Sequence, residues 1–265
     1  SNGKLLMLLN LELLAWKMQH YKFQILKSTE ESRGYLLRFV KRNFDCKVVT
    51  KDKIEQDRIL IFSNPIIDGF DVLKKYPKLN YLYIDNGYLG NHLEKRPMYY
   101  RISYNSLQNA NIKPVPYSRS NTIQFKTQSW NSKGDYNLLV CPGEKSPVWN
   151  FTNSNYHEWK EHMIEKFDNL KIREKTGPRF PRFKTLWEDI ADAKKVIVYH
   201  SMTAVEAMMM GKEVHVSGHS AIELYSDKYN YNREPLIEHI AWSQFSREEF
   251  FDGTAWNLTH EYQMK

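Results

Sequence analysis

Short continuous runs of apolar residues alternate along the chain with segments whose apolar residues recur at helical spacing. Runs of the first kind are typical of buried strands, and they fall at residues 22–26, 46–49, 58–62, 80–84, 137–141, 170–173, 196–198 and 213–217. The segments between them read as helices; residues 156–167, for example, carry Trp159, Met163 and Phe167 on one face. This alternation predicts an α/β fold with parallel sheets and crossover helices.

The alternation is interrupted once, and the interruption divides the chain into two blocks. Residues 89–128 show a looser pattern, which we interpret as a partly structured surface segment, and the polar run 131–135 is the best linker candidate. The pattern predicts two Rossmann-like domains facing a central cleft, residues 21–130 and 135–240. A helix is expected within the tail, residues 241–265, and its aromatic side chains would pack it back on the first domain.

Residues 1–20 form an N-terminal extension, either a native amphipathic helix or a helix left by the expression vector. Its apolar stretch is interrupted by Asn10 and Glu12 and is too short to span a membrane. The chain has only two cysteines, Cys46 and Cys141, so no disulfide framework or cysteine-based zinc site is expected. A cytoplasmic location fits these features.

The most informative stretch is residues 193–218, which reads as strand, polar turn, helix, glycine and strand. His200 follows the first strand, Ser201 and Thr203 lie at the start of the helix, and Glu206 comes within its first turns. A strand that leads into a helix N-terminus is the geometry that receives an anion in open α/β sheets. A nucleoside diphosphate would suit these groups; the alternatives are that His200 is structural and that Glu206 is an exposed helix acid.

Two neighbouring strand ends add candidate ligands for the same diphosphate. Gly143 and Ser146 follow one predicted strand, while Arg173 and Lys175 lie at the end of the next. In a parallel sheet these loops share one edge, where two cations could meet phosphates. The alternative is that Arg173 and Lys175 are simply solvent-exposed side chains at a strand end.

Charge and aromatic content indicate an anionic partner. The formal net charge is +7 and aromatic residues make up 14% of the chain. Phosphate contacts combined with base stacking would suit nucleic acid. The alternative is that the positive charge serves only to keep the protein soluble. The segment that best combines the two residue types contains Arg96, Tyr99, Tyr100, Arg101 and Tyr104.

The stretch around Glu206 resembles a nucleotide-sugar signature of GT-B glycosyltransferases. The residues that carry the resemblance are the turn His200-Ser201-x-Thr203-x-x-Glu206-Ala207 and the later Gly211-Lys212-x-Val214, with Glu213 where that family has proline. Residues 135–260 resemble capsule-polysaccharide-type transferases and their phage-encoded relatives most. The resemblance implies that Glu206 binds the donor ribose, and that Arg173, Lys175, His200 and Ser201 meet the donor phosphates.

The first block should then supply the acceptor side and any general base. Asp85, at a strand end, is the leading candidate and Asp68 the second; Asp85 could instead simply form a turn. We expect a monomeric transferase that moves a hexose or pentose from a nucleotide sugar, UDP-linked, without an obligatory metal.

Double-stranded DNA carrying a hydroxymethylated pyrimidine is the favoured acceptor, and a phage enzyme would act in the host cytoplasm. The alternatives are a transferase for a capsule or surface glycan and a non-catalytic nucleotide- or nucleic-acid-binding module.

Overall fold

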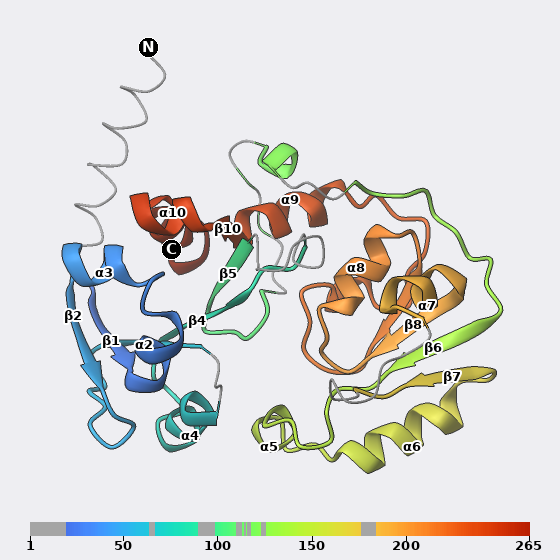
Figure 1. Ribbon diagram of the computed structural model, residues 1–265, viewed down its shortest axis with the longest axis horizontal. Helices are drawn as coiled ribbons and strands as arrows, with labels where there is room; N and C mark the ends of the chain where they lie inside the picture. Colours follow the sequence, from blue (N-terminus) through green and yellow to red (C-terminus); the bar gives the residue numbers. More distant parts are fainter. Residues whose placement is uncertain are drawn as a thin grey trace, which may run out of the picture. The chain divides into compact units, whose positions relative to one another are not determined.

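The computed structural model describes residues 20–63, 67–89, 99–109, 113, 115, 118–122, 126–175 and 184–265 (Figure 1). Expectations for residues 1–19 and for Arg96 lie outside this part of the chain. The polypeptide separates into two compact units. The first contains Ser1–Asn109, Lys113–Thr122 and Glu238–Lys265, and the second contains Ala110–Ile112 and Ile123–Ile237.

The first unit is built on a six-stranded sheet with the order β10-β5-β4-β3-β1-β2. Its elements are β1 (Lys22–Leu26), α2 (Lys27–Arg33), α3 (Arg38–Asn43), β2 (Asp45–Val49), β3 (Ile59–Phe62), α4 (Ile67–Lys75), β4 (Tyr81–Asn86), β5 (Tyr99–Tyr104), η1 (Ser120–Thr122), β10 (Gln244–Ser246), α10 (Arg247–Asp252), α11 (Thr254–Thr259) and the π-helix η3 (His260–Met264). Strands β2, β1, β3 and β4 are parallel, as the alternating pattern predicts.

Alternate residues of each strand face opposite sides of this sheet, and different helices cover the two sides. One core contains Ile25 and Ile61 from the strands, Val40 from α3, and Phe250 and Trp256 from α10 and α11. Phe62 points to the opposite side, where its ring lies 6.5 Å from that of Phe70 on α4. Aromatic residues of the C-terminal tail therefore lie inside the core of the first unit.

The predicted surface segment at residues 89–128 is wrong in its central part, because residues 99–104 form the buried strand β5. β5 pairs antiparallel with β4 on one side and with β10 on the other. β10 itself interrupts the predicted tail helix. The sheet is therefore mixed rather than wholly parallel, with the far edge completed by residues from the end of the chain.

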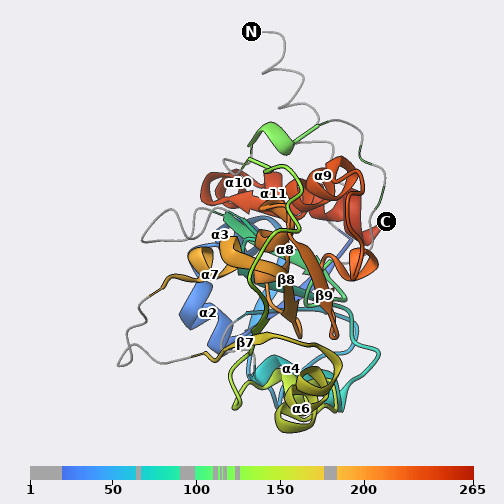
Figure 2. The same cartoon turned by 90° about the vertical axis from the view of Figure 1, so that its right-hand side faces the viewer.

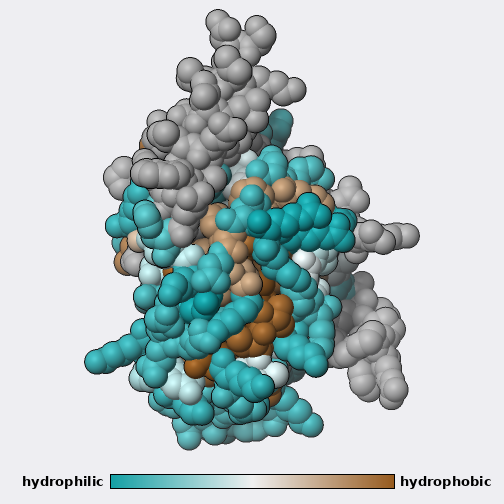
Figure 3. Space-filling view, turned by 90° about the vertical axis from the view of Figure 1, so that its left-hand side faces the viewer, coloured by the Kyte–Doolittle hydropathy of each residue, from teal (hydrophilic) through white to brown (hydrophobic). Residues whose placement is uncertain are grey.

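One edge of this sheet is open. β2 is the terminal strand, and Val48 on it is 44% exposed. The side of the molecule that carries β2 is largely hydrophilic, with an apolar area near its centre (Figure 3).

The second unit contains a four-stranded parallel sheet with the order β7-β6-β8-β9. Its elements are β6 (Tyr136–Val140), α5 (Val148–Phe151), α6 (Tyr156–Lys166), β7 (Leu170–Arg173), α7 (Leu186–Asp192), β8 (Ala193–Val198), α8 (Thr203–Met209), β9 (Glu213–Val216) and η2 (Glu223–Tyr225). Helix α9 (Glu234–Ser243) leads from this unit into the first. These strands match the predicted ones closely.

The order of the strands places the helices on both faces of the second sheet. The chain moves one way from β6 to β7 and the opposite way from β7 through β8 to β9, so right-handed crossovers put α6 on one face and α7 with α8 on the other. Figures 1 and 2 show this arrangement. Trp159 and Met163 are buried on α6, as predicted. Among the described residues, no helix combines the length and apolar content needed to cross a membrane.

Candidate functional site

The carboxyl ends of the second sheet provide the strongest candidate for a ligand site. β6 lies between β7 and β8 in the parallel sheet. The order in which strands are added therefore reverses between β6 and β8: β7 is added on one side, and β8 and β9 on the other. Open parallel sheets bind ligands at such a switch point, outside the carboxyl ends of the strands. The loops after β6 and β8 therefore define the candidate site, and they carry Gly143, Ser146, His200 and Ser201.

The turn between β8 and α8 is held by its own hydroxyl groups. The Ser201 hydroxyl donates to Thr203 Oγ1 at 2.9 Å and accepts from the Thr203 backbone N–H at 3.2 Å. Thr203 is buried, whereas His200 and Ser201 are partly exposed. The hydroxyl groups predicted to meet phosphates thus also fix the start of the helix.

Glu206 lies one turn into α8, between the buried residues Val205 and Ala207. Burial raises the pKa of its carboxyl group to about 7. The cause is the poor solvation of a charged carboxylate among apolar neighbours. Glu206 therefore changes its protonation near neutral pH, a property that is frequent at functional sites.

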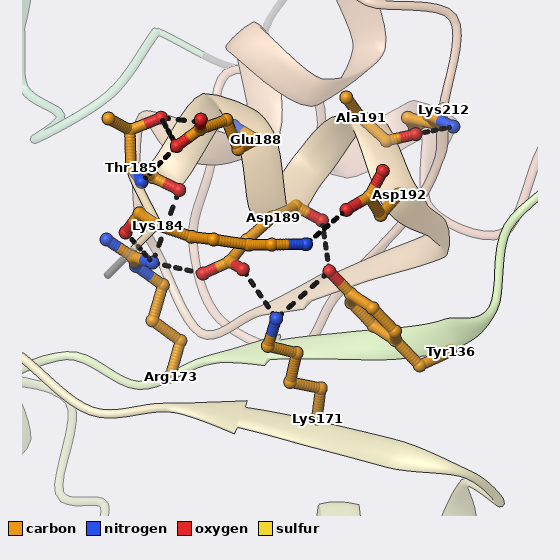
Figure 4. Close-up of polar contacts among 10 residues, drawn as sticks. All are labelled: Tyr136, Lys171, Arg173, Lys184, Thr185, Glu188, Asp189, Ala191, Asp192 and Lys212. Carbon is orange, nitrogen blue, oxygen red and sulfur yellow. Dashed lines mark hydrogen bonds and ion pairs between the residues drawn. The ribbon is translucent and has the colours of Figure 1, made fainter. Parts of the chain in front are cut away.

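Arg173 lies at the predicted strand end, where its guanidinium group contacts other residues of the second unit. Its guanidinium group forms an ion pair with Asp189 of α7 and donates to the backbone oxygen of Lys184 at 3.3 Å (Figure 4). Lys171 binds the other oxygen of the same carboxylate at 2.6 Å. Burial alone would raise the pKa of Asp189, but the hydrogen bonds from Lys171 and Arg173 outweigh it and lower that pKa. Arg173 thus belongs to an ion-pair cluster within the second unit, and its contact with the donor phosphates stays a prediction.

Lys175 is a further cation at this edge. It is exposed on the loop after β7. A Cβ atom added at Gly143 would lie 3.9 Å from Lys175 Cδ, so the loops after β6 and β7 are neighbours. The Gly143 carbonyl accepts from the Ser146 N–H at 2.9 Å and from Trp149 Nε1 at 3.0 Å.

Sequence reasoning missed an aromatic cluster that ties these loops together. The rings of Trp149 and Tyr199 lie 4.4 Å apart, and Trp159 lies 5.7 Å from each of them. The Tyr199 hydroxyl contacts Thr152 Oγ1 at 2.8 Å, and Trp159 Nε1 donates to the hydroxyl of Ser217 after β9 at 2.6 Å. A tyrosine directly after the apolar run of β8 was the available signal.

The base candidates of the first unit are engaged in ion pairs. Asp85 lies opposite Arg101 across the β4–β5 pair; its carboxylate binds that guanidinium at 3.1 Å and accepts from the Tyr83 hydroxyl at 2.8 Å. Asp68, on α4, lies 3.8 Å from Lys51 Nζ. The structure brings neither of them into a described pocket.

Among the residues predicted to contact nucleic acid, the four that the structure describes lie in strand β5. Arg101 is 4% exposed and donates to the backbone oxygen of Asn86 at 2.9 Å. Tyr100 is also 4% exposed and accepts from the hydroxyl of Tyr35 at 2.7 Å. Tyr99 and Tyr104, at the ends of β5, are only half-buried. Burial of Tyr100 and Arg101 corrects the prediction of a continuous stacking and phosphate-binding segment.

Within the described residues, no group of histidine, cysteine, aspartate and glutamate side chains is arranged to hold a metal ion. The polar groups at the carboxyl edge of the second sheet include hydroxyls, lysines, a histidine and the carboxyl group of Glu206, whose pKa is raised. Such a set can form hydrogen bonds to sugar hydroxyls and can meet phosphate charge.

With this geometry, the fold can be compared with those of known proteins. The chain is similar in fold to a glycosyltransferase. The β-Kdo 2,7 transferase of KpsC from Thermosulfurimonas dismutans superposes with a TM-score of 0.55 at 15% sequence identity, over 89% of this chain and 99% of the other. The β-Kdo 2,4 transferase of the same KpsC gives a TM-score of 0.48 at 14% identity, over 90% and 99%, a value too low to support an argument.

The sequence resemblance to capsule-polysaccharide-type transferases thus has a counterpart in the fold. The chain matches no protein-family model and no curated protein sequence.

Proposed function

We propose that this chain is a glycosyltransferase that uses a nucleotide-sugar donor, and that the donor nucleotide binds at the carboxyl edge of the second sheet. The observation that carries the proposal is Glu206: a carboxyl group with a pKa of about 7 lies on the helix that follows the switch-point strand β8. The fold, which resembles that of a Kdo transferase, is consistent with this use.

Each polar group at this edge has a role in the proposal. The carboxyl group of Glu206 accepts hydrogen bonds from the donor ribose, whereas Ser201 and His200 lie where the turn could meet the diphosphate. The sequence predicted that Arg173 and Lys175 would both contact the diphosphate. In this proposal Lys175 supplies the positive charge, because Arg173 is paired with Asp189. The backbone at Gly143 leaves room for the donor beside Lys175. A UDP-sugar is the first donor to test.

For the acceptor, a glycan is favoured over DNA. The fold likeness is to a transferase that acts with the sugar Kdo. The DNA hypothesis rested on charge, chain size and family likeness, and two residues of its predicted contact segment, Tyr100 and Arg101, are buried in the sheet. A hydroxymethylated pyrimidine remains a second acceptor to test, supported by the net charge of +7.

We further propose that no metal is needed, because Lys175 and the backbone amides of the turn can meet the diphosphate charge. Restoration of activity by Mn²⁺ after chelation would refute this. We propose Asp85 as the general base, with Asp68 as the second candidate. The pairing of Asp85 with Arg101 and Tyr83 makes comparison of Asp85→Asn with Asp68→Asn essential.

The proposal is tested by donor binding and turnover. Purified chain is incubated with UDP-sugars, alone and with oligosaccharide or hydroxymethylated DNA acceptors, and products are read by mass spectrometry. Glu206→Ala is expected to weaken nucleotide affinity in calorimetry by about tenfold or more, since hydrogen bonds to a charged group are worth about 1.5 to 3 kcal/mol.

Lys74→Ala, a change of a helix residue on α4 in the first unit, serves as control and should leave the affinity unchanged. Unaltered nucleotide affinity in Glu206→Ala would show that the ribose site is placed wrongly. Absence of both hydrolysis and transfer with every donor would leave the transferase proposal without support.

A further inference from the structure

A pocket of about 400 Å³ lies in the second unit at the end of α8 opposite to the proposed donor site. Its walls are residues 127–130, which precede β6, and residues 231–237, which lead into α9 and its first turn. The backbone N–H of Gln128 donates to the Met209 oxygen at the C-terminal end of α8, whereas Ser201 and Thr203 lie at its N-terminal end. The volume falls within the range of small-molecule sites.

The two walls are fastened to α8 by specific contacts. Arg233 Nη1 donates to the Met208 oxygen at 2.8 Å, and its Nη2 donates to the Gln128 oxygen at 2.6 Å. Gly211 has a φ of +77°, and a Cβ atom there would lie 2.0 Å from the backbone oxygen of Ser129. Only glycine allows this close approach without strain. The pocket is therefore a built feature of the unit.

Aromatic rings line the pocket or support its wall. The ring of Trp130 lies 5.0 Å from that of Tyr229 and 4.9 Å from that of Tyr231, with edge-on geometry in both pairs. Tyr231 in turn stacks on Tyr225 at 4.4 Å. The Arg233 guanidinium lies 4.3 Å above the Trp130 ring, which holds the indole in place. Trp130 is thus a rigid but partly exposed aromatic surface.

Apart from Ile237, the remaining lining is polar, and it has no excess of positive charge. Gln128 and Asn232 contribute exposed amide side chains, and Thr127 contributes a hydroxyl group. Arg233 is offset by Glu234, the one acidic residue of the lining. Nucleic acid would require a surplus of cations for its phosphates. Sugar rings instead present C–H groups to an aromatic face and hydroxyl groups to amides, which matches this lining.

We propose that this pocket binds a sugar unit of a glycan chain, as a carbohydrate site distinct from the donor site. The inference rests on the proposed function for the idea that glycans are the material this chain handles. The site would hold the glycan on the second unit while other groups carry out the chemistry.

The test is affinity electrophoresis of the full chain in native gels that contain dextran, galactomannan or colominic acid. At least one of these polysaccharides should retard the wild-type chain. Trp130→Ala is expected to weaken that binding about tenfold, because it removes the aromatic surface. Gln128→Ala removes only an exposed side chain and leaves the backbone contacts of residue 128 in place. It should weaken the binding about two- to threefold. Trp187→Ala, on α7 of the same unit, is the matched control and should bind as the wild type does.

Two outcomes would overturn the inference. In the first, none of the three polysaccharides retards the wild-type chain. In the second, the wild type, Trp130→Ala and Gln128→Ala are retarded equally. Retardation by a single-stranded oligonucleotide in place of every polysaccharide would refute the sugar assignment.

Donor turnover measured on the same preparations separates this inference from the proposed function. Turnover without retardation refutes the pocket alone, and retardation without turnover supports the pocket while counting against the transferase.

Discussion

Two carboxylate side chains of the second unit, Asp189 and Glu206, are both withdrawn from water on neighbouring helices, yet their pKa values shift in opposite directions. Asp189 of α7 is held by Lys171 and Arg173, and its pKa is lowered despite burial. Glu206 of α8 has its pKa raised to about 7 by burial. The ion pairs with Lys171 and Arg173 keep Asp189 negatively charged and stabilise the fold. The burial of Glu206 leaves a carboxyl group that changes its protonation near neutral pH, and this property supports the proposed donor site at the β8–α8 edge.

The largest effect is expected from Asp189→Asn. This change leaves Lys171 and Arg173 without their carboxylate, and breaking a buried ion pair from one side costs about 3 kcal/mol or more. The free energy of unfolding, measured in urea, should fall by about that amount.

Asp192→Asn is the control, because the Asp192–Lys184 pair is exposed and should contribute less than about 1 kcal/mol. A loss for Asp189→Asn no larger than that of Asp192→Asn would show that the cluster is not structural. The Asp189 contribution is present above its unfolded pKa and is lost as the pH falls through the lowered folded value.

The next effect in size, with a defined pH dependence, is expected from Glu206→Gln. The folded pKa of about 7 lies above the model value of 4.5, so the fold favours the protonated side chain. That contribution is complete at low pH and is lost as the pH rises through about 7. The stability of the wild type relative to Glu206→Gln should therefore fall by about 3 kcal/mol between about pH 4 and about pH 8.

Urea denaturation of both proteins across this pH range is the measurement. Parallel stability curves would mean that the carboxyl group of Glu206 is well solvated in the folded protein, and the contrast with Asp189 would disappear.

The smallest effect should come from Ser201→Ala. Loss of the hydroxyl that accepts from the Thr203 N–H should cost about 1 kcal/mol of stability, as for other residues at helix starts. If the turn also meets the donor, nucleotide affinity should fall about threefold or more, as expected for loss of one hydrogen bond.

Ser32→Ala, which removes a hydroxyl bonded to the Ser28 carbonyl in the first unit, should change stability only slightly and affinity not at all. Equal nucleotide affinity in both variants would restrict Ser201 to a structural role.

The strands of the second unit were predictable because each is a short apolar run between polar turns, and each pairs with a parallel neighbour. The same reasoning failed at Tyr99–Tyr104, where tyrosine and arginine resemble an exposed segment. β5 becomes interior only because β10, more than a hundred residues later, pairs with it. A local pattern carries no information about such a distant partner.

The candidate site residues also fall into two groups: those whose place follows from the local sequence, and those whose contacts depend on how distant segments pack. The placement of Ser201, Thr203 and Glu206 follows from their position just after the β8 strand, so the sequence alone located them at the carboxyl edge. Arg173 occupies the expected strand end, but its guanidinium turns to Asp189, whose position on α7 depends on how the helix packs. Arg101 likewise meets Asp85 only through the register of β4 and β5.

The sequence by itself determined the α/β class, most strands of both sheets and the turn at His200–Glu206, because these follow from local periodicity and from residues a few positions apart. Only the tertiary structure decided which charged groups are buried or paired within the protein. Burial and ion pairing depend on segments brought together by folding, and so Arg173 and Arg101 became paired with carboxylates while Glu206 acquired a pKa of about 7.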